Sequence, residues 1–539
     1  MEPNNHDLVI IGGGLAGASI ATVMARAGAD VLVLEKERAF KDRVRGEFLA
    51  PWAIRDVESL DLMETLRGAG AIDLPALAGR SLKPRRVETP NGEVPLSFSH
   101  GAAQEALLVT AQLAGAQVIR GATVTAAPAK GGEATLFRTP DGNGAALARL
   151  VVGADGRSSL ARKALDRREH LHRTNRVLAG VLLEDVPADP SFGYFVIREQ
   201  VGGLVSLFPQ ANGRARAYVF LEGNDASAYR GAEGYDRFIR DMVDLGVPGH
   251  ALAGARQAGP LGAFVADDSW IKHPASDSLA LVGDAAGVSD PTWGQGLALA
   301  FHDARVLTRE LLRQRDWRTA AHRYAKQRDE YYRTVITAEG WLTELQLTSG
   351  PLADARRAHV MRVWKTDPLR AAGLDLPGRG PALDTSEEAR RRVFGEDVPV
   401  ATAPASKAGI AIDPADAFLA ALRQRDFEAL AALVGSGARM RALLPGGPIE
   451  LHGSDAVAAA FQRWFGTVTQ FEALATTRDE VADRIRMSWR CRIRWDGEEF
   501  DRIIEQQAYA KVVDGQIVVM DLLCTGFRPV SNEPLDRAA

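Results

Sequence analysis

The sequence predicts an α/β domain with a mostly parallel sheet and an inserted antiparallel sheet, followed by a smaller α+β domain. Three observations support this fold class. Three short apolar runs each end in a glycine-containing turn, as buried parallel strands do before a loop or helix. The apolar period changes to that of strands between about residues 176 and 220. Near residue 413 a new pattern begins, with amphipathic helices followed by long alternating strands.

The first apolar run, Leu8–Ile11, is followed by the letters GGGLAG and then by a helical pattern. This is G-x-G-x-x-G in the context that gives the motif meaning, between a buried strand and a helix. Gly12 allows the tight turn, Gly14 lets the backbone approach a pyrophosphate, and Gly17 lets the helix lie close to the strand. The free N–H groups at the helix N-terminus favour bound phosphates. The stretch therefore predicts a dinucleotide site.

A second strand, Val31–Leu34, delivers Glu35 to the same edge of the sheet. A carboxylate at this position can accept hydrogen bonds from both ribose hydroxyls, which completes a Rossmann-like fingerprint. The fingerprint alone leaves NAD and FAD open. Arg38, Arg43 and Arg45 follow closely, and they suit either a bound phosphate or a solvated basic turn.

Two later strands end in similar turns. Leu150–Ala154 runs into the letters DGRSS, and Ser278–Val282 runs into GDAAG, then DPTWGQG, then a long helix from Leu297 to about Leu312. The helix N-terminus again directs free N–H groups at a ligand. Helices are also predicted at Gln104–Ala114, Gly234–Val247 and Ala320–Leu347, and a strand at Ala116–Thr125. The antiparallel sheet is predicted as an insertion at about 172–275, and the stretch 349–409 as a weakly ordered tether.

The motifs GGGLAG, GADGRSS and GDAAG…DPTWGQG, in this order, resemble the class A flavoprotein monooxygenases of the para-hydroxybenzoate hydroxylase type. The resemblance covers about Asp7–Glu396. It implies a bound FAD that NAD(P)H reduces and that reacts with O₂ to give a C4a-hydroperoxyflavin. That species passes an oxygen atom to an electron-rich ring or olefin, so the resemblance implies hydroxylation or epoxidation. Two features depart from the family: Gln104, with His100 near it, stands where a flavin-contacting arginine is common, and no tyrosine pair for deprotonating a phenol is evident.

By this likeness Glu35 holds the adenosine ribose, Arg45 lies along the cofactor, Asp155 closes the nucleotide and reductant side, and Asp284 contacts the ribityl chain. Pro291 and the backbone of residues 294–296 would face the isoalloxazine. The full predicted cofactor set is Gly12, Gly14, Leu15, Ala16, Gly17, Glu35, Lys36, Arg45, Gln104, Val124, Asp155, Gly283, Asp284, Pro291, Gly294, Gln295, Gly296 and Leu297.

The substrate pocket is predicted between the 176–220 sheet and the flavin edge. Its predicted residues are Trp52, Phe208, Pro209, Thr292 and Trp293. Because the sheet carries few ionic groups, we expect an apolar natural-product intermediate, polycyclic or prenylated. The alternatives are an FAD-dependent reductase of the geranylgeranyl type, a halogenase, for which the W-x-W-x-I-P signature is absent, and a non-redox cyclase that uses FAD as a scaffold.

The C-terminal part is predicted as a linker at 398–412, a domain at 413–528 and a tail at 529–539. Arg484–Trp495 alternates strictly, which places five arginines on one face. A two-residue turn at Asp496-Gly497 would set Arg494 opposite Glu499, Arg492 opposite Asp501 and Ser488 opposite Glu505. Acids then match the basic row, so a solvated charged face is favoured over an anion site.

A second turn at Asp514-Gly515 would place Asp521 opposite Ala508, on the apolar face. Helices followed by such a curved meander resemble the SnoaL-like, NTF2-like cone, whose pocket serves cyclases, isomerases and dimer interfaces. By that likeness Asp521, beside Trp489 and Arg502, is a candidate catalytic acid or base. The favoured alternative is a carboxylate paired with Arg502 or Gln506 in an accessory domain, through which the chain could form a homodimer.

Composition limits the partners. The 539 residues carry 65 basic and 69 acidic side chains, a net charge of −4, so neither nucleic acid nor an anionic membrane is suggested. Two separated cysteines predict no disulfide framework and no metal site. The N-terminus has no signal-peptide pattern, and no apolar window is long enough to span a membrane. The sequence therefore predicts a cytoplasmic enzyme acting on a small hydrophobic molecule.

Overall fold

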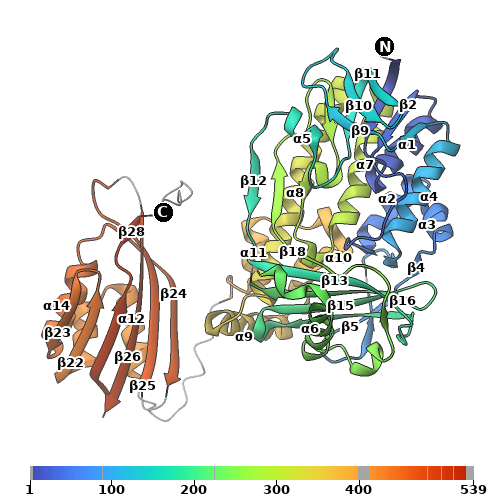
Figure 1. Cartoon of the computed structure of the whole chain (residues 1–539). Coiled ribbons are helices and arrows are strands. Elements are labelled where there is room, and N and C mark those ends of the chain that lie inside the picture. Colours follow the sequence, from blue (N-terminus) through green and yellow to red (C-terminus); the bar gives the residue numbers. More distant parts are fainter. Residues whose placement is uncertain are drawn as a thin grey trace. The chain divides into compact units, whose positions relative to one another are not determined.

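The computed structural model describes residues 4–87, 89–223, 225–398, 413–481, 484–498, 501–513 and 515–529. The chain forms two compact units (Figure 1). Unit 1 comprises Met1–Ser349 and Arg357–Asp397, and unit 2 comprises Gly350–Arg356 and Val398–Ala539. The predicted linker lies almost entirely outside the described residues.

A seven-stranded sheet forms the core of the first half of unit 1. Its order is β8-β2-β1-β11-β10-β9, and β20 pairs with β11. The parallel strands are β1 (Asn4–Ile11), β2 (Val31–Glu35), β8 (Gln117–Arg120), β11 (Gly142–Gly153) and β20 (Leu279–Leu281), while β9 (Thr123–Ala126) and β10 (Thr135–Thr139) are antiparallel. The three predicted strand ends therefore meet at one edge, because β1, β11 and β20 are neighbours that run in the same direction.

Helices pack against this sheet. α1 (Leu15–Arg26) contacts both α4 (His100–Leu113) and α7 (Gly296–Arg313), and α7 contacts α8 (Trp317–Gln346). These helices agree with the predicted ones to within a few residues. The predicted strand Ala116–Thr125 is instead two strands, β8 and β9. Between them Gly121 has φ +74, a left-handed conformation that ends β8 and turns the chain.

The inserted antiparallel sheet is present. β13 (Arg176–Glu184), β16 (Arg214–Glu222), β15 (Gly203–Gln210) and β14 (Phe192–Arg198) follow one another in the sheet, and α6 (Gly231–Asp244) packs beside β16. β17 (Arg256–Gln257) and β18 (Gly262–Val265) pair with β13, while β5 (Ala76–Ala78) and β6 (Pro84–Arg86) extend the other edge. In Figure 1 this sheet lies below the parallel-sheet half of unit 1.

The region from 351 to 397 is helical, so its prediction as a tether is wrong. It forms α9 (Pro351–Thr366), α10 (Leu376–Arg379) and α11 (Glu387–Phe394). Val360, Leu376 and Phe394 are buried in the main core of unit 1. The segments between prolines and glycines are short, which hides their apolar period from sequence reasoning.

Smaller elements complete unit 1. They are α2 (Ile54–Ser59), α3 (Met63–Gly68), α5 (Leu160–Ala164), β3 (Phe48–Leu49), β4 (Ile72–Asp73), β7 (Leu96–Ser97), β12 (Glu169–His172), β19 (Asp268–Ile271) and β21 (Gly287–Val288). Within the described residues, no helix is both long and apolar enough to cross a membrane, and no cluster of three or more His, Cys, Asp or Glu side chains could hold a metal ion. Cys491 and Cys524 are free thiols.

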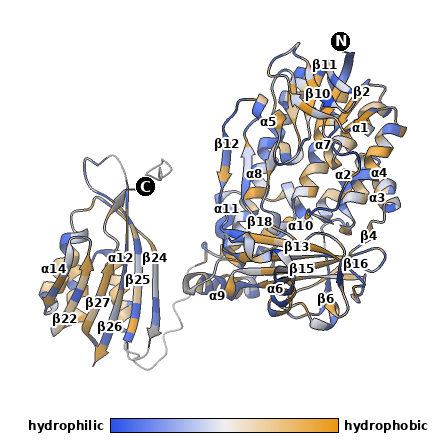
Figure 2. Cartoon of the chain, in the orientation of Figure 1, coloured by the Kyte–Doolittle hydropathy of each residue, from blue (hydrophilic) through white to orange (hydrophobic). Residues whose placement is uncertain are grey.

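Unit 2 is a curved sheet packed against helices. The sheet order is β23-β22-β27-β26-β25-β24. Its elements are α12 (Pro414–Gln424), α13 (Phe427–Ala432), α14 (Ser454–Phe465), β22 (Val434–Leu444), β23 (Gly447–His452), β24 (Gln470–Val481), β25 (Arg484–Arg494), β26 (Arg502–Val513), β27 (Gln516–Cys524) and β28 (Arg528–Pro529). Phe418, Phe461 and Trp489 pack together at its centre. Figure 2 shows hydrophobic stretches alternating with hydrophilic ones along these strands.

The basic row on β25 is matched by acids, as predicted, but with other partners. Ser488 lies opposite Gln507, two residues from the predicted register. Because a two-residue shift keeps every side chain on its face, the row still meets acids. Its ion pairs are Arg486–Asp479, Arg490–Glu505, Arg492–Glu472 and Arg494–Asp501. Glu499 and Asp514, named in the predicted turns, lie outside the described residues.

The predicted placement of Asp521 on the apolar face is wrong. Val513 lies opposite Gln516, but the register shifts by one at Lys511/Val512, so that Tyr509 lies opposite Asp521. A one-residue slip moves every later side chain to the other face. The Asp521 carboxylate accepts a hydrogen bond from Arg441 Nε at 2.7 Å and one from Arg484. Both guanidinium groups hold the pKa of Asp521 below its ordinary value, and Arg441 has the larger effect.

Candidate cofactor and substrate site

The glycine turn has the geometry that its spacing predicts. Gly12 has φ +101, and a Cβ there would lie 2.5 Å from the carbonyl oxygen of Ala154. A Cβ on Gly17 would lie 2.1 Å from the carbonyl oxygen of Gly12, closer than any side chain tolerates. Gly14 is the N-cap of α1, and no side chain caps this helix end. The first N–H groups of α1 are therefore available to an anion.

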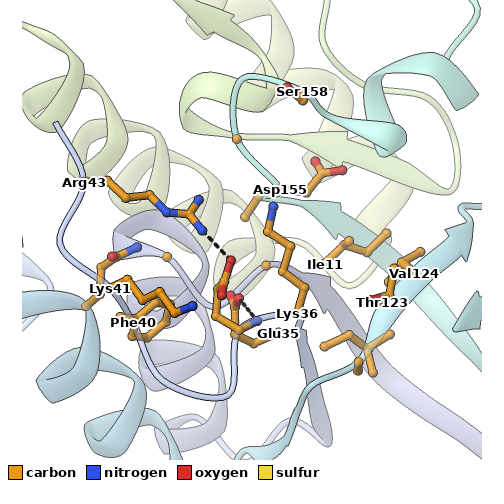
Figure 3. Close-up of a pocket in the computed structure, with 18 of the residues that line it drawn as sticks. Ile11, Glu35, Lys36, Phe40, Lys41, Arg43, Thr123, Val124, Asp155 and Ser158 are labelled. Carbon is orange, nitrogen blue, oxygen red and sulfur yellow. Dashed lines mark hydrogen bonds and ion pairs between the residues drawn. The ribbon is translucent and has the colours of Figure 1, made fainter. Parts of the chain in front are cut away.

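A cavity of about 210 Å³, the nucleotide cavity, opens in front of this turn (Figure 3). It lies where the ends of β1, β2 and β11 meet α4 and β9. Eight of the predicted cofactor residues line it: Gly12, Gly14, Glu35, Lys36, Arg45, Gln104, Val124 and Asp155. The amide nitrogen of Gln104 lies 3.5 Å from the position that a Cβ on Gly14 would occupy, so Gln104 faces the turn directly.

Glu35 is fixed at the end of β2. The residue is 5% exposed, and its carboxylate accepts hydrogen bonds from Gly13 N at 2.7 Å and Glu37 N at 2.8 Å. Each carboxylate oxygen can accept a further bond, as a pair of ribose hydroxyls requires. Glu37 in turn pairs with Arg43, and Arg43 lines the same cavity as Glu35 (Figure 3). The backbone amides and the open helix N-terminus can donate hydrogen bonds to phosphates, and the Glu35 carboxylate can accept them from a ribose. Together these groups fit the adenosine diphosphate part of FAD.

Asp155 holds its own turn together. Its carboxylate accepts hydrogen bonds from Leu160 N at 2.7 Å, Ala161 N at 3.1 Å and the hydroxyl of Ser159. These bonds satisfy the N-terminus of α5. Asp155 thus lines the nucleotide cavity while its side chain shapes the loop. Its predicted contact with the nucleotide stays a prediction.

The glycine turn that begins at Gly283 is stabilised by a buried residue of α7. Gly283 N donates to Asp303 Oδ2 at 2.7 Å, and Asp303 on α7 is fully buried against Arg328. Asp284 is half-buried beside it, and its backbone oxygen accepts a bond from Arg162. Neither Gly283 nor Asp284 is among the residues that line the nucleotide cavity. Their predicted contact with the cofactor stays a prediction.

A second cavity of about 300 Å³, the apolar cavity, lies between the inserted sheet and the loop 291–295. The sheet supplies Leu178, Phe195, Ser206, Phe208, Tyr218, Phe220 and Phe264, and the loop supplies Pro291, Thr292, Trp293, Gly294 and Gln295. The rings of Phe48 and Phe208 stack with centroids 5.0 Å apart. The predicted residues Phe208, Thr292 and Trp293 are therefore part of this wall.

Two predicted pocket residues are not among those that line the apolar cavity. Pro209 follows Phe208 on β15, so strand alternation turns it to the other face. Trp52 lies behind the wall, where its Nε1 donates to Gln295 Oε1 at 2.8 Å. A Cβ on Gly380, which has φ +50, would lie 2.4 Å from the Trp52 ring. Trp52 therefore supports the loop 291–295 from outside the cavity.

Arg45 lines both cavities, so the segment Arg45–Phe48 separates them. Side chains from three elements hold this segment. Tyr218 on β16 donates to Arg45 O, His100 on α4 contacts Gly46 O through Nδ1 at 2.9 Å, and Arg216 on β16 donates through Nε to Glu47 Oε2 at 2.8 Å. Sequence reasoning missed Glu47 and Arg216, because nothing local marks two residues 169 positions apart as partners.

Burial shifts the pKa values of two side chains at this segment, Glu47 and His100. The Glu47 and Arg216 side chains are both fully buried. Desolvation raises the pKa of Glu47, although Arg216 and the His100 N–H oppose it. Desolvation, with Arg45 nearby, lowers the pKa of His100 to about 3. The imidazole is therefore neutral at physiological pH, and it brings no positive charge to the nucleotide cavity that it lines.

The apolar cavity is also walled by residues from the region predicted as a tether. Leu374, Asp375, Leu376 and Pro377 line it, together with Leu342 and Gln346 of α8. No motif or period in the sequence indicates this contact.

Residues 5–336 match the family model described as an FAD binding domain, and residues 415–520 match a SnoaL-like domain. The first match covers more than half of the chain. The protein is thus an FAD-binding oxidoreductase of the class that includes flavin monooxygenases and reductases. The chain belongs to the FAD binding domain family of class A flavin monooxygenase type, with a C-terminal SnoaL-like domain.

Three relatives illustrate the range of this class. A digeranylgeranylglycerophospholipid reductase of Methanoculleus marisnigri is 29% identical over 324 residues, which are 56% of this chain and 75% of the reductase. Squalene epoxidase erg1 of Aspergillus fumigatus is 25% identical over 331 residues, 58% of this chain and 67% of the epoxidase. The solved p-nitrophenol 4-monooxygenase PnpA of Pseudomonas putida has a TM-score of 0.58 and 16% identity, covering 73% of this chain and 98% of that one. PnpA thus shares the fold.

Proposed function

We propose that this protein is an FAD-dependent monooxygenase that adds one oxygen atom from O₂ to an electron-rich ring or double bond of a mostly apolar small molecule, with NAD(P)H as reductant. The observation that carries the proposal is the pair of adjoining cavities. The nucleotide cavity has polar groups that suit a dinucleotide, and the apolar cavity has aromatic walls. Arg45 borders both.

In this proposal the residues of unit 1 bind the cofactor, orient the substrate and exclude water from the two cavities. The glycine turn, Glu35 and Gln104 would hold FAD, which supplies the redox chemistry when bound. The predicted contacts of Leu15, Ala16 and Leu297 at the starts of α1 and α7, and of Pro291 and residues 294–296, are part of this proposal. The aromatic wall orients an apolar substrate and excludes water, which otherwise consumes reactive intermediates. Arg216 offsets the charge of Glu47 at this wall.

A reductase is the second candidate, because one relative carries that name and an apolar cavity can also accept an isoprenoid chain. Oxygen dependence separates the two. A panel of apolar aromatic compounds and polyenes is incubated with the purified holoenzyme and NADH or NADPH, with and without air. A monooxygenase forms product only in air, with oxygen uptake. Product formation without air would support the reductase, and turnover without NAD(P)H consumption would support a cyclase.

Unit 2 is proposed to be an accessory module, through which the chain can dimerise. Its candidate acid, Asp521, is paired with two arginines on the face opposite the buried Met520 and Leu522. A carboxylate held ionised in this way is a poor general acid. Deleting residues 413–539 should leave the identity of the product unchanged, and a different product would show that unit 2 acts on the substrate.

A further inference from the structure

A short segment outside the family match closes part of the apolar cavity. This cavity-closing segment, Leu374–Pro377, lies beyond residue 336, where the FAD binding domain match ends. Leu374 and Leu376 are buried in the core of unit 1, and Asp375 between them is half-buried. Asp375 is therefore an acidic residue in a wall that is otherwise mainly aromatic and aliphatic.

Two other polar side chains of this wall, Glu47 and Gln295, have protein partners, whereas the buried hydroxyl of Thr292 has none among the described residues. Glu47 accepts hydrogen bonds from Arg216, Gln210 and the His100 N–H. Gln295 accepts a bond from Trp52 and donates to Trp293 O at 2.6 Å. Asp375 is therefore the acidic group of this wall with the fewest protein partners, and Thr292 is a neutral group that could also bind a ligand.

Asp375 has acceptor capacity to spare. One carboxylate oxygen accepts a bond from Gly378 N at 3.1 Å, which caps α10, and the other lies 3.9 Å from the Nε of Arg379. A carboxylate can accept about four hydrogen bonds. Burial raises the pKa of Asp375 more than Gly378 N–H and Arg379 lower it, so its protein partners leave the charge incompletely compensated.

We propose that Asp375 binds a hydrogen-bond donor at the polar end of the substrate, a protonated amine or a hydroxyl, on an otherwise apolar ring system. The aromatic side chains of the same wall suit either group, because ring faces attract cations and rings pack against rings. This inference rests on the proposed function in one respect, that the apolar cavity holds the substrate.

The position of Asp375 is tied to the loop 291–295, which lines the same cavity. Gly380, three residues after Pro377, contacts the Trp52 ring, and Trp52 donates to Gln295. A donor group seated on Asp375 is thus held at a fixed place relative to the loop 291–295. The cavity-closing segment determines which end of the substrate binds at Asp375 and how deeply the ring system enters the apolar cavity.

Binding of three matched probes tests the inference. The probes are naphthylmethylamine, naphthol and naphthalene, which share a ring system and differ in the donor group. Each is titrated into the purified full-length holoenzyme without NAD(P)H, and the change in flavin absorbance is recorded. The wild type should bind the amine or the hydroxyl compound roughly tenfold more tightly than naphthalene, as expected for one charge-assisted hydrogen bond. The tighter of the two identifies the donor.

Two variants separate the donor site from the helix cap. Asp375→Asn keeps an oxygen for the Gly378 N–H but removes the charge, and Asp375→Ser keeps the cap with a shorter side chain. Asp375→Ser should lose the roughly tenfold preference for either donor probe, and Asp375→Asn should lose it for the amine, while both variants still bind naphthalene. Asp384→Asn is the matched control, since Asp384 is exposed, caps the Ser386 N–H and lies outside the cavity. It should behave as the wild type.

The inference is overturned if the wild type binds naphthalene as tightly as both donor probes, or if Asp375→Ser keeps the preference. Because this assay needs neither NAD(P)H nor O₂, it is independent of the proposed reaction. An enzyme that shows the preference but transfers no oxygen would overturn the proposed function and leave the role of Asp375 intact.

Discussion

The nucleotide cavity and the apolar cavity share Arg45 but are built in different ways. The first is built around backbone at the ends of parallel strands, with Glu35 as its one buried acid and further polar side chains around it. The second consists of side chains from the inserted sheet, the loop 291–295 and the cavity-closing segment. Backbone sites depend on a few glycines close together in sequence, whereas side-chain sites depend on packing between distant segments. Different substitutions should therefore disrupt the two cavities.

The largest effect is expected from Gly17→Val in the nucleotide cavity. Any Cβ at this position meets Gly12 O, so α1 must move away from β1. We expect a loss of at least about 3 kcal/mol of folding free energy and loss of bound FAD. Urea unfolding and flavin absorbance measure both. Gly28→Ala is the control, because Gly28 has φ +84 with open space around it and should cost about 1–2 kcal/mol. Full FAD content in Gly17→Val would contradict this role of the turn.

Glu47→Gln is expected to break the wall between the cavities. It leaves Arg216 buried without its main partner, which should cost about 3–5 kcal/mol. Replacing both residues, as Glu47→Gln with Arg216→Gln, should recover part of this loss, because the one charge then left without its partner is that of the partly exposed Asp42. Urea unfolding of the four proteins of this cycle measures the coupling. Additive losses would show that the pair is not coupled.

His100 should make stability depend on pH. Its pKa is about 3 in the folded protein, against 6.5 for an unperturbed histidine, so the unfolded chain binds the extra proton between these values. Stability from this group is present above pH 6.5 and is lost as pH falls, by about 2 kcal/mol at pH 5. His100→Asn, which can still donate to Gly46 O, should flatten this part of the profile. An unchanged difference between wild type and variant from pH 7 to pH 5 would contradict a neutral buried imidazole.

The smallest effect is expected from Asp521→Asn in unit 2. Its ion pairs with Arg441 and Arg484 lie at a partly exposed site, so the loss should be below about 1 kcal/mol. NAD(P)H oxidation should be unchanged, since nothing in the geometry gives Asp521 an acid or base role. A large fall in turnover with unchanged stability would restore Asp521 as a catalytic candidate.

Local patterns predicted the strand, glycine turn, helix and second strand around Glu35 well, because these elements follow one another in the chain. The errors arose where distant structure decides. A single register shift at Lys511/Val512 turned Asp521 to the other face. The Glu47–Arg216 pair and the cavity-closing segment depend on tertiary packing alone. For Pro209, strand alternation in the sequence already indicated the face that the structure shows.

The central claim is that the two cavities together transfer an oxygen atom, and isotope labelling tests it most directly. The holoenzyme is supplied with NAD(P)H, an apolar substrate from the panel and heavy-isotope dioxygen, and the product is examined by mass spectrometry. The account predicts a product that has gained one heavy oxygen atom, with water in the medium contributing none. A product that has gained two hydrogen atoms and no oxygen would contradict it and assign the protein to the reductases.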